Sequence, residues 1–269
     1  MTRIIQISDP HIVPNGQLAY GQVDTAAALA SCVKTVNRLL PEIGPVDLAI
    51  VTGDITDFGT KEEYQLFREI MEPLKLPYRA IPGNHDNVVN MRASFSDQSW
   101  MSSTGPINWT IEFDDLVLIA LDSSIAGQAH GHLSDETLSF LANTLELQKG
   151  LPVLVALHHP PITTGIEKMD IQNLRESAKL EEILSRYSGE LRLICGHVHR
   201  NIVASFGSII CQIAPGVSHA VSMDLRSGAP NCLTKEPGGV LLHETRSGIV
   251  THHIPTGQFA GPFLFYPNG

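Results

Sequence analysis

Short apolar runs alternate with segments of helical periodicity through the first half of the chain. The runs RIIQIS (residues 3–8), DLAIV (47–51) and YRAIP (78–82) have the length and apolar character of buried strands. Between them, apolar residues recur at helical spacing, first at Leu29, Val33, Val36 and Leu40, and then at Tyr64, Phe67, Met71 and Leu74. This order of strand, helix and strand predicts βαβ units.

Local signals mark the ends of these two helices. Thr60 followed by Glu63 has the spacing of a capping box, which predicts the start of the second helix. Pro41, Gly44 and Pro45 predict the end of the first helix. Residues 87–105 are expected to form a loop that is long enough to be functional.

The remainder of the chain is richer in strands. Strands are predicted at WTIEF (109–113), LVLIAL (116–121), PVLVAL (152–157) and LRLIC (191–195), with helices over 134–147 and 173–187. After residue 201 the apolar runs IVASF, SIICQI, GVLLHE and IVTHHI are separated by Gly, Pro and Ser. We therefore predict a layered α/β sandwich with mixed sheets, in which residues 1–201 form the core and the strand-rich residues 202–269 complete it.

Composition narrows the class of protein. With 269 residues, of which 43% are hydrophobic and 17% charged, the chain can bury a sizeable core. A net charge of −10 argues against a nucleic-acid polymer as partner. The N-terminus enters a strand almost at once and no apolar stretch approaches about 18 residues, so we expect a cytoplasmic protein without a membrane partner. The four cysteines show no CxxC spacing and are expected to be reduced and mostly buried: Cys32, Cys195, Cys211 and Cys232.

Polar side chains with metal-binding chemistry follow five of the predicted strands. They occur in the sequences Asp9-Pro10-His11, Gly53-Asp54, Gly83-Asn84-His85-Asp86, His158-His159 and Gly196-His197-Val198-His199. One such sequence alone is more often a turn, but five in succession are not explained by loop composition. Because the carboxyl ends of strands in an open α/β sheet gather along one edge, the sequence predicts a metal site there.

The candidate ligands are two carboxylates, one amide and four imidazoles: Asp9, His11, Asp54, Asn84, His158, His197 and His199. Seven ligands exceed what one ion with an open position needs, so two ions that share a bridging carboxylate are the simplest interpretation. Nitrogen and oxygen donors without thiolate favour Zn, Mn, Fe or Co. If the extended path continues past Gly196, His197 and His199 lie on one face and Val198 on the other. Glycines before Asp54, Asn84 and His197 suit sharp turns close to the ions.

The ordered motifs D-x-H, G-D-x-x-D, G-N-H-D, H-H-P-P and G-H-x-H, which span residues 9–199, resemble the calcineurin-like metallophosphoesterase superfamily. The resemblance implies a four-layer αββα sandwich of two mixed sheets flanked by helices, with a dinuclear metal centre. It implies that Asp9, His11, Asp54 and His199 hold one ion, that Asp54 bridges, and that Asn84, His158 and His197 hold the second. His85 matches a histidine that contacts the phosphate or assists the leaving group, and Asp86 would orient it.

The sequences GDITDFGTKEEY, PGNHD, HHPPI and GHVHR are most similar to those of class III cyclic-nucleotide phosphodiesterases and their glycerophosphodiesterase relatives. Asp57 stands where purple acid phosphatases have a tyrosine ligand, so a tyrosinate-bound ferric ion is not expected. Phe58-Gly59 replaces the Arg-Gly of protein serine/threonine phosphatases, which removes a phosphate-binding arginine. The resemblance therefore favours small phosphodiesters as substrates.

The implied reaction is hydrolysis of a cyclic nucleotide or a glycerophosphodiester. Two divalent ions, two aspartates and a bridging hydroxide give the centre a net charge near +1, which suits the phosphodiester monoanion, and the hydroxide would attack in line. The alternatives on the same centre are a phosphomonoesterase or a pyrophosphohydrolase. A DNA nuclease is disfavoured by the acidic composition, and a non-catalytic scaffold of this fold by the presence of all seven candidate ligands.

Two features of the C-terminal part carry further expectations. Pro215-Gly216 follows the run SIICQI as a loop would, and we expect it to bring His219 to the rim of the metal site, where it would join Asn84 and His85 in binding substrate. Residues 257–269, GQFAGPFLFYPNG, are too apolar for a free tail. They are expected either to pack on the same chain or, as we favour, to contact another subunit of a homo-oligomer.

Overall fold

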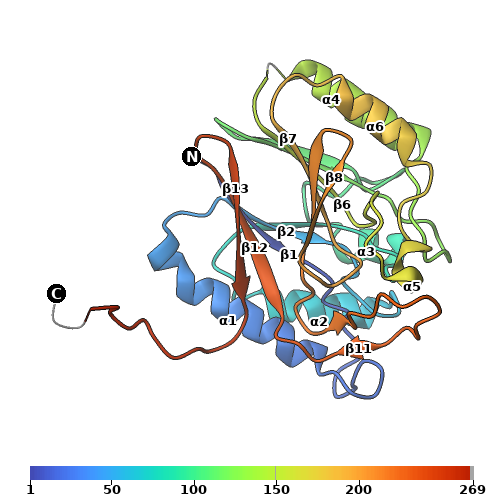
Figure 1. Cartoon of the computed structure of the whole chain (residues 1–269). Coiled ribbons are helices and arrows are strands. Elements are labelled where there is room, and N and C mark those ends of the chain that lie inside the picture. Colours follow the sequence, from blue (N-terminus) through green and yellow to red (C-terminus); the bar gives the residue numbers. More distant parts are fainter. Residues whose placement is uncertain (149, 267–269) are drawn as a thin grey trace.

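Two β-sheets face each other between two layers of helices in a computed structural model that describes residues 1–148 and 150–266 (Figure 1). The first sheet has the strand order β13-β12-β1-β2-β3. Its strands are β1 (Arg3–Ile7), β2 (Leu48–Thr52), β3 (Tyr78–Ile81), β12 (Gly239–Thr245) and β13 (Ile249–Pro255). Strands β1, β2 and β3 are parallel, and β12 and β13 are antiparallel to their neighbours.

The second sheet has six strands in the order β4-β5-β6-β7-β9-β8. They are β4 (Trp109–Glu112), β5 (Val117–Leu121), β6 (Val153–Leu157), β7 (Leu191–Cys195), β8 (Ile202–Phe206) and β9 (Ile209–Ile213). Strands β5, β6, β7 and β9 are parallel, and the edge strands β4 and β8 are antiparallel to them. A separate pair is formed by β10 (Ala220–Val221) and β11 (Leu233–Thr234).

The helices cover the outer faces of the two sheets. They are α1 (Thr25–Ile43), α2 (Lys61–Met71), α3 (Val88–Ser94), α4 (Asp135–Leu147), α5 (Glu167–Asp170) and α6 (Ser177–Ser185). In β5, Val117 and Ile119 pack in one cluster with α4 and α6, whereas Leu118 and Ala120 pack with the first sheet and α1 to α3. Each central strand is therefore apolar on both faces. The predicted four-layer αββα sandwich of two mixed sheets is confirmed.

Residues after 201 contribute strands to both sheets. Strands β8 and β9 extend the second sheet, and β12 inserts between β1 and β13 in the first. The division of the chain at residue 201 stays a prediction. Beyond β13 the chain runs away from the body of the molecule (Figure 1). The aromatic residues of this segment, Phe259, Phe263, Phe265 and Tyr266, are between 56% and 98% exposed.

Some helices differ from the prediction in their ends or their position. Helix α1 continues through Pro41 to Ile43, because Leu40 and Ile43 still pack on the core. Helix α6 begins only at Ser177, since Asn173 instead donates a hydrogen bond to the Ile162 carbonyl and is buried in a loop. The supposed loop 87–105 contains α3, and it contributes buried aromatic side chains to the core.

Other local predictions hold. The Thr60 capping box is present at the start of α2. All four cysteines lie in the described part of the chain and are free; three are buried and Cys232 is exposed. Among residues 1–148 and 150–266, no helix has the length and apolar character needed to cross a bilayer.

Candidate metal centre

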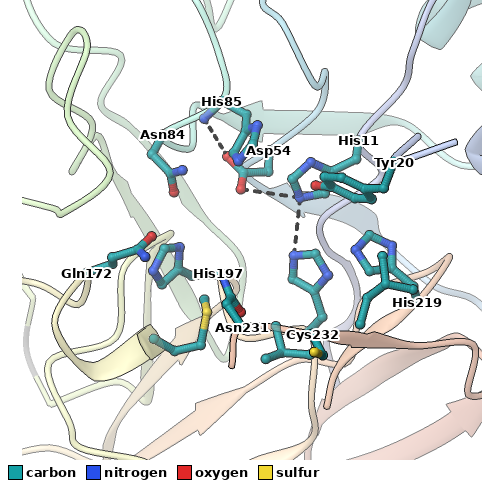
Figure 2. A pocket seen from close by; sticks show the side chains of 14 residues that line it. His11, Tyr20, Asp54, Asn84, His85, Gln172, His197, His219, Asn231 and Cys232 are labelled. Atoms are coloured by element: carbon teal, nitrogen blue, oxygen red, sulfur yellow. Dashed lines mark hydrogen bonds and ion pairs between the residues drawn. The ribbon is translucent and has the colours of Figure 1, made fainter. Parts of the chain in front are cut away.

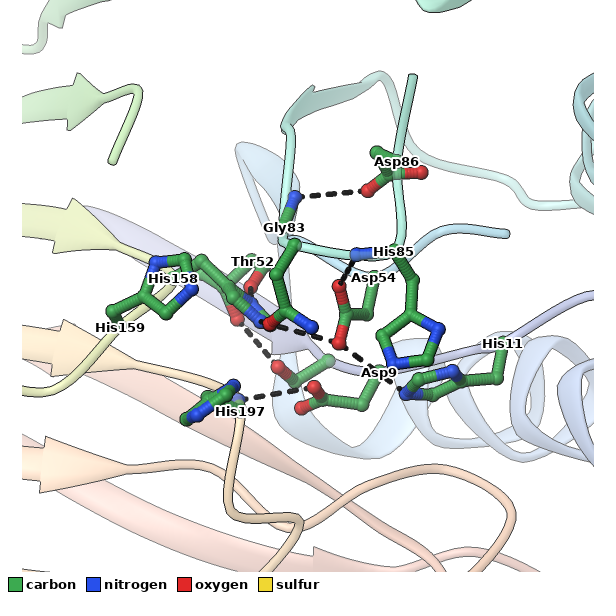
Figure 3. Close-up of polar contacts among 12 residues, drawn as sticks. Asp9, His11, Thr52, Asp54, Gly83, His85, Asp86, His158, His159 and His197 are labelled. Atoms are coloured by element: carbon green, nitrogen blue, oxygen red, sulfur yellow. Dashed lines mark hydrogen bonds and ion pairs between the residues drawn. The ribbon is translucent and has the colours of Figure 1, made fainter. Parts of the chain in front are cut away.

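The predicted ligands meet at the carboxyl-terminal edge of the two sheets, and each sheet supplies part of the set (Figure 3). Asp9, His11, Asp54 and Asn84 follow strands β1, β2 and β3 of the first sheet, whereas His158, His197 and His199 follow β6 and β7 of the second. All except Asn84 are buried. The site therefore exists only where the ends of both sheets are held side by side.

The first cluster brings together one donor atom from each of Asp9, His11, Asp54 and His199. His11 Nε2 lies 3.1 Å from His199 Nε2 and 3.4 Å from Asp54 Oδ2, and His199 Nε2 lies 3.3 Å from Asp9 Oδ1. Donor atoms that share one ion at about 2.1 Å are about 3.0 to 3.4 Å apart in octahedral or tetrahedral geometry. These three distances have the spacing of ligands of one ion, and all four donor atoms lie within 4.8 Å of one another.

The second cluster surrounds His158. Its Nε2 lies 3.2 Å from Asp54 Oδ2 and 3.2 Å from Asn84 Oδ1. The His197 ring is 5.2 Å from the His158 ring between centroids, and His159 can also offer a donor atom here. The same oxygen of Asp54 thus faces His11 in the first cluster and His158 in the second, as a bridging ligand would.

Hydrogen bonds on the far side of two imidazoles decide which nitrogen faces the clusters. His158 Nδ1 is 2.8 Å from the Thr52 carbonyl, which can only accept, so Nδ1 carries a hydrogen and Nε2 is the nitrogen that faces the cluster. His11 Nδ1 is 3.0 Å from Asp57 Oδ1, and the same argument applies to it. In its neutral form, each ring would present a free lone pair on Nε2 to a metal ion.

Several buried side-chain atoms at this edge have no hydrogen-bond partner among the described residues, and two of them belong to predicted ligands of different clusters. Asp9 Oδ2 and His197 Nε2 form no hydrogen bond to the part of the chain that the structure describes. An unsatisfied buried polar atom costs about 1 to 3 kcal/mol, more if it is charged. A divalent cation would satisfy both, and the nitrogen and oxygen donors fit such an ion. The cluster is therefore able to bind a divalent metal.

The backbone at the strand ends is strained. Five residues that are not glycine have positive φ angles at this edge: Asp9, His11, Asp54, His197 and His199. Left-handed conformations of this kind cost about 1 to 3 kcal/mol each and occur preferentially at functional sites. The expected extended path past Gly196 is wrong, because φ is 73° at His197 and 54° at His199. The two histidines reach different clusters, and Val198 is buried in the core of the second sheet.

Glycine is required where the strand ends approach one another, as expected. A Cβ atom on Gly83 would lie 2.2 Å from Asp54 Oδ1, and one on Gly196 would lie 2.3 Å from Ser8 Oγ. Gly53 has a φ of 92°, and a Cβ there would lie 2.4 Å from the His158 ring. Any side chain at these positions would displace a predicted ligand or its neighbour.

A cavity of about 230 Å³ opens onto the clusters (Figure 2). His219 lines its wall, as predicted, with its ring 4.6 Å from the His199 ring and 5.7 Å from the His11 ring. Sequence reasoning missed several lining residues, among them Tyr20, Gln172 and Asn231. They come from segments that do not directly follow a strand, so the strand-end pattern gave no signal for them.

His85 also lines the cavity, but Asp86 does not orient it, which corrects the prediction. His85 Nδ1 lies 2.9 Å from the Asp57 carbonyl and 3.5 Å from its carboxylate. The Asp86 carboxylate turns away and accepts hydrogen bonds from the Gly83 and Ile55 amides, among other donors. Adjacent side chains leave the chain in different directions here, so Asp86 fixes the loops while Asp57 holds both His11 and His85.

Charge is distributed unevenly among the histidines. Burial opposes a positive charge on His158, but the carboxylate of Asp54 outweighs this and raises the pKa of His158 to about 9. Although burial alone would raise it, the pKa of Asp54 is held well below its usual value by His158. Burial lowers the pKa of His197 to about 3 and that of His219 to about 2. At neutral pH, the His158 imidazole of metal-free protein would therefore be protonated.

Comparisons with known proteins identify the family and the fold. Residues 2–201 match the calcineurin-like phosphoesterase family. The chain is 42% identical to a probable glycerophosphodiester phosphodiesterase of Arcobacter nitrofigilis, over 98% of this chain and 96% of that protein. It is 32% identical to a 3',5'-cyclic adenosine monophosphate phosphodiesterase of Haemophilus influenzae, over 99% and 93% of the two chains. A dimetal phosphatase from Danio rerio has the same fold, with a TM-score of 0.63 at 14% identity over 95% of this chain and 99% of that one.

These similarities and the ordered metal-binding side chains define a metallophosphoesterase. The chain belongs to the calcineurin-like phosphoesterase family, and the resemblance noted in its motifs is confirmed.

The raised pKa of His158 predicts how metal binding depends on pH. An ion can bind Nε2 only after its proton leaves, so apparent affinity should fall about tenfold for each pH unit below about 9. Titration of metal-free protein with Mn²⁺ at pH 6.5, 7.5 and 8.5 would measure this. An affinity that is equal at all three values would contradict the protonated state of His158.

Proposed function

We propose that this protein is a hydrolase of small phosphodiesters that works with two divalent ions, each Fe, Mn, Zn or Co. Asp9, His11, Asp54 and His199 would hold one ion, and Asp54, Asn84, His158 and His197 the other. The observation that carries the proposal is the position of Asp54 Oδ2, within 3.4 Å of His11 Nε2 and 3.2 Å of His158 Nε2. Bound ions would neutralise the phosphate and acidify a water molecule to attack phosphorus.

The side chains of the cavity wall would handle the substrate. His85 Nδ1 is engaged by the Asp57 carbonyl, which leaves Nε2 to donate a proton or a hydrogen bond to the departing alkoxide oxygen. Its pKa is raised because the attraction of Asp54 and Asp57 exceeds the effect of burial. This shift is in the direction that favours a protonated His85, as a general acid requires.

The charge of the cavity favours a diester over a pyrophosphate. Among the described residues that line it, none is lysine or arginine. A substrate with a second phosphate would bring charge that only the ions could balance, whereas a phosphodiester carries a single negative charge. The amides of Gln172 and Asn231 and the hydroxyl of Tyr20 suit neutral hydroxyl-bearing groups. These features support glycerophosphodiesters or cyclic nucleotides, the substrate classes that the relatives' names give.

Metal-dependent hydrolysis of diesters is the first expected activity. Chelated protein should be inactive on bis-p-nitrophenyl phosphate and recover with Mn²⁺, Zn²⁺, Co²⁺ or Fe²⁺, with lower activity on p-nitrophenyl phosphate. Asp54→Ala should lose both ions and activity, because one carboxylate serves both clusters. Full activity after both ions are shown to be removed would contradict the proposal, and a preference for the monoester would favour a phosphomonoesterase.

We propose that His219 contacts substrate without binding an ion. His219→Ala should lower kcat/KM for a diester about 10- to 100-fold, the effect of losing a hydrogen bond to a charged group, while the metal content stays unchanged. His252→Ala, an exposed histidine on β13, is the matched control and should behave as wild type. Unchanged kinetics with both ions present would exclude the contact, and loss of metal would instead make His219 a ligand.

We propose that the protein is a homo-oligomer. Five large apolar side chains beyond β13 are between 56% and 98% exposed: Phe259, Phe263, Leu264, Phe265 and Tyr266. An exposed cluster of this kind usually marks an interaction surface. Light scattering at micromolar concentration should give at least a dimeric mass for the full chain and a monomeric mass for a chain ending at residue 258. A monomeric full chain would contradict the proposal.

The free cysteines support a reducing, cytoplasmic location.

A further inference from the structure

A buried carboxamide lies between the two sheets beneath the metal centre. Gln6, in β1, has no exposed surface, although its neighbours in the sheet interface are mostly apolar. Burying an amide in a protein costs on the order of 1 to 3 kcal/mol unless its hydrogen bonds are made. Whether a buried glutamine here destabilises the fold therefore depends on the hydrogen bonds that its side chain makes.

Every polar atom of this amide has a partner. Gln6 Nε2 donates to Thr52 Oγ1 at 3.0 Å and to the Cys195 carbonyl at 2.9 Å. Gln6 Oε1 accepts from His243 Nε2 at 3.0 Å, and His243 Nδ1 pairs with Thr251 Oγ1 at 2.8 Å. Because the Cys195 carbonyl can only accept, the amide cannot be turned around, and His243 must carry a hydrogen on Nε2.

The partners of Nε2 stand next to predicted ligands. Thr52 ends β2 two residues before Asp54, and Cys195 ends β7 two residues before His197. Thr52 Oγ1 also bonds Ser8 Oγ at 2.8 Å, and Ser8 immediately precedes Asp9. The Thr52 carbonyl accepts from His158 Nδ1, the bond that fixes the tautomer of His158 (Figure 3).

Apolar packing between the sheets does not fix their relative position closely, because dispersion and the hydrophobic effect are not directional. Hydrogen bonds are directional and weaken steeply when their geometry changes. The Gln6 amide joins the end of β2 in the first sheet to the end of β7 in the second, two residues before Asp54 and His197. It is placed to set the separation of side chains that must lie about 3 Å apart to share an ion.

We propose that Gln6 is a positioning residue for the second ion: by tying Cys195 to Thr52, it holds His197 and His158 at the correct distance from Asp54. The inference rests on the proposed two-ion centre. Gln6 contacts neither ion nor substrate, and it acts through the two strand ends. The first ion should depend on it less, because the side chain of His11 is held separately by Asp57.

The test compares two variants of the same hydrogen-bonded network. Gln6→Met keeps the length of the side chain but removes both bonds to the strand ends. His243→Leu removes the bond on the opposite side, in β12, and leaves both strand-end bonds in place. Both variants lose buried hydrogen bonds and should have a lower Tm, so stability alone does not separate them. Metal-free protein of each variant is titrated with Mn²⁺ by calorimetry.

We expect Gln6→Met to bind the second Mn²⁺ about 10- to 100-fold more weakly than wild type, the usual effect of losing a group that orients ligands. The first Mn²⁺ should bind within a few-fold of wild type. His243→Leu should bind both ions as wild type does. Wild-type binding by Gln6→Met, or equal weakening in His243→Leu, would overturn the role of Gln6.

A double variant covers the case in which Gln6→Met does not fold. Gln6→Met with His243→Leu leaves no imidazole N–H unpaired, so it should be more stable than the sum of the single changes and still bind the second ion weakly. Recovery of second-ion binding in this variant would contradict the proposal. A wild-type chain that binds a single Mn²⁺ would instead contradict the two-ion centre itself.

Discussion

One oxygen of Asp54 joins the two halves of this molecule. It lies between His11, carried by the first sheet, and His158, carried by the second. Because the carboxylate is buried, its charge must be balanced by groups from both sides. Attraction to Asp54 keeps His158 protonated when no cation is bound, and a divalent ion would replace that proton. The architecture of two facing sheets therefore serves to bring opposite charge and free lone pairs to one point.

Bringing these side chains together strains the backbone at the strand ends, and the surrounding structure stabilises that conformation. Five predicted ligands adopt left-handed backbone conformations, and Gly53, Gly83 and Gly196 leave room that no other residue would leave. The strain is compatible with a stable fold because the strands behind it are buried on both faces. Between the sheets, the Gln6 amide adds the directional contact that apolar side chains lack.

The substrate of this protein depends on the residues that line the cavity as much as on the candidate metal ligands. Proteins of one fold carry different activities, so the family alone does not choose a substrate. Here Asp57 holds both His11 and His85, which links the candidate metal cluster to a side chain of the cavity wall. The cavity is lined by amides, a tyrosine and histidines, and no described residue that lines it is lysine or arginine; such a lining suits a singly charged phosphodiester with neutral hydroxyl groups.

The sequence by itself determined the layers and the strand ends, because the apolar period and the Asp, Asn and His residues that follow each strand are local properties of the chain. The sequence correctly predicted the sandwich and the position of His219 near the candidate metal site. It could not predict that His197 and His199 diverge, that Asp57 replaces Asp86 as the partner of His85, or that Tyr20, Gln172 and Asn231 complete the cavity. Nor could it predict the contact of Gln6 with Cys195, 189 positions away. Only tertiary structure decided these features, because each depends on contacts between segments distant in sequence, whose geometry is set by how the two sheets pack.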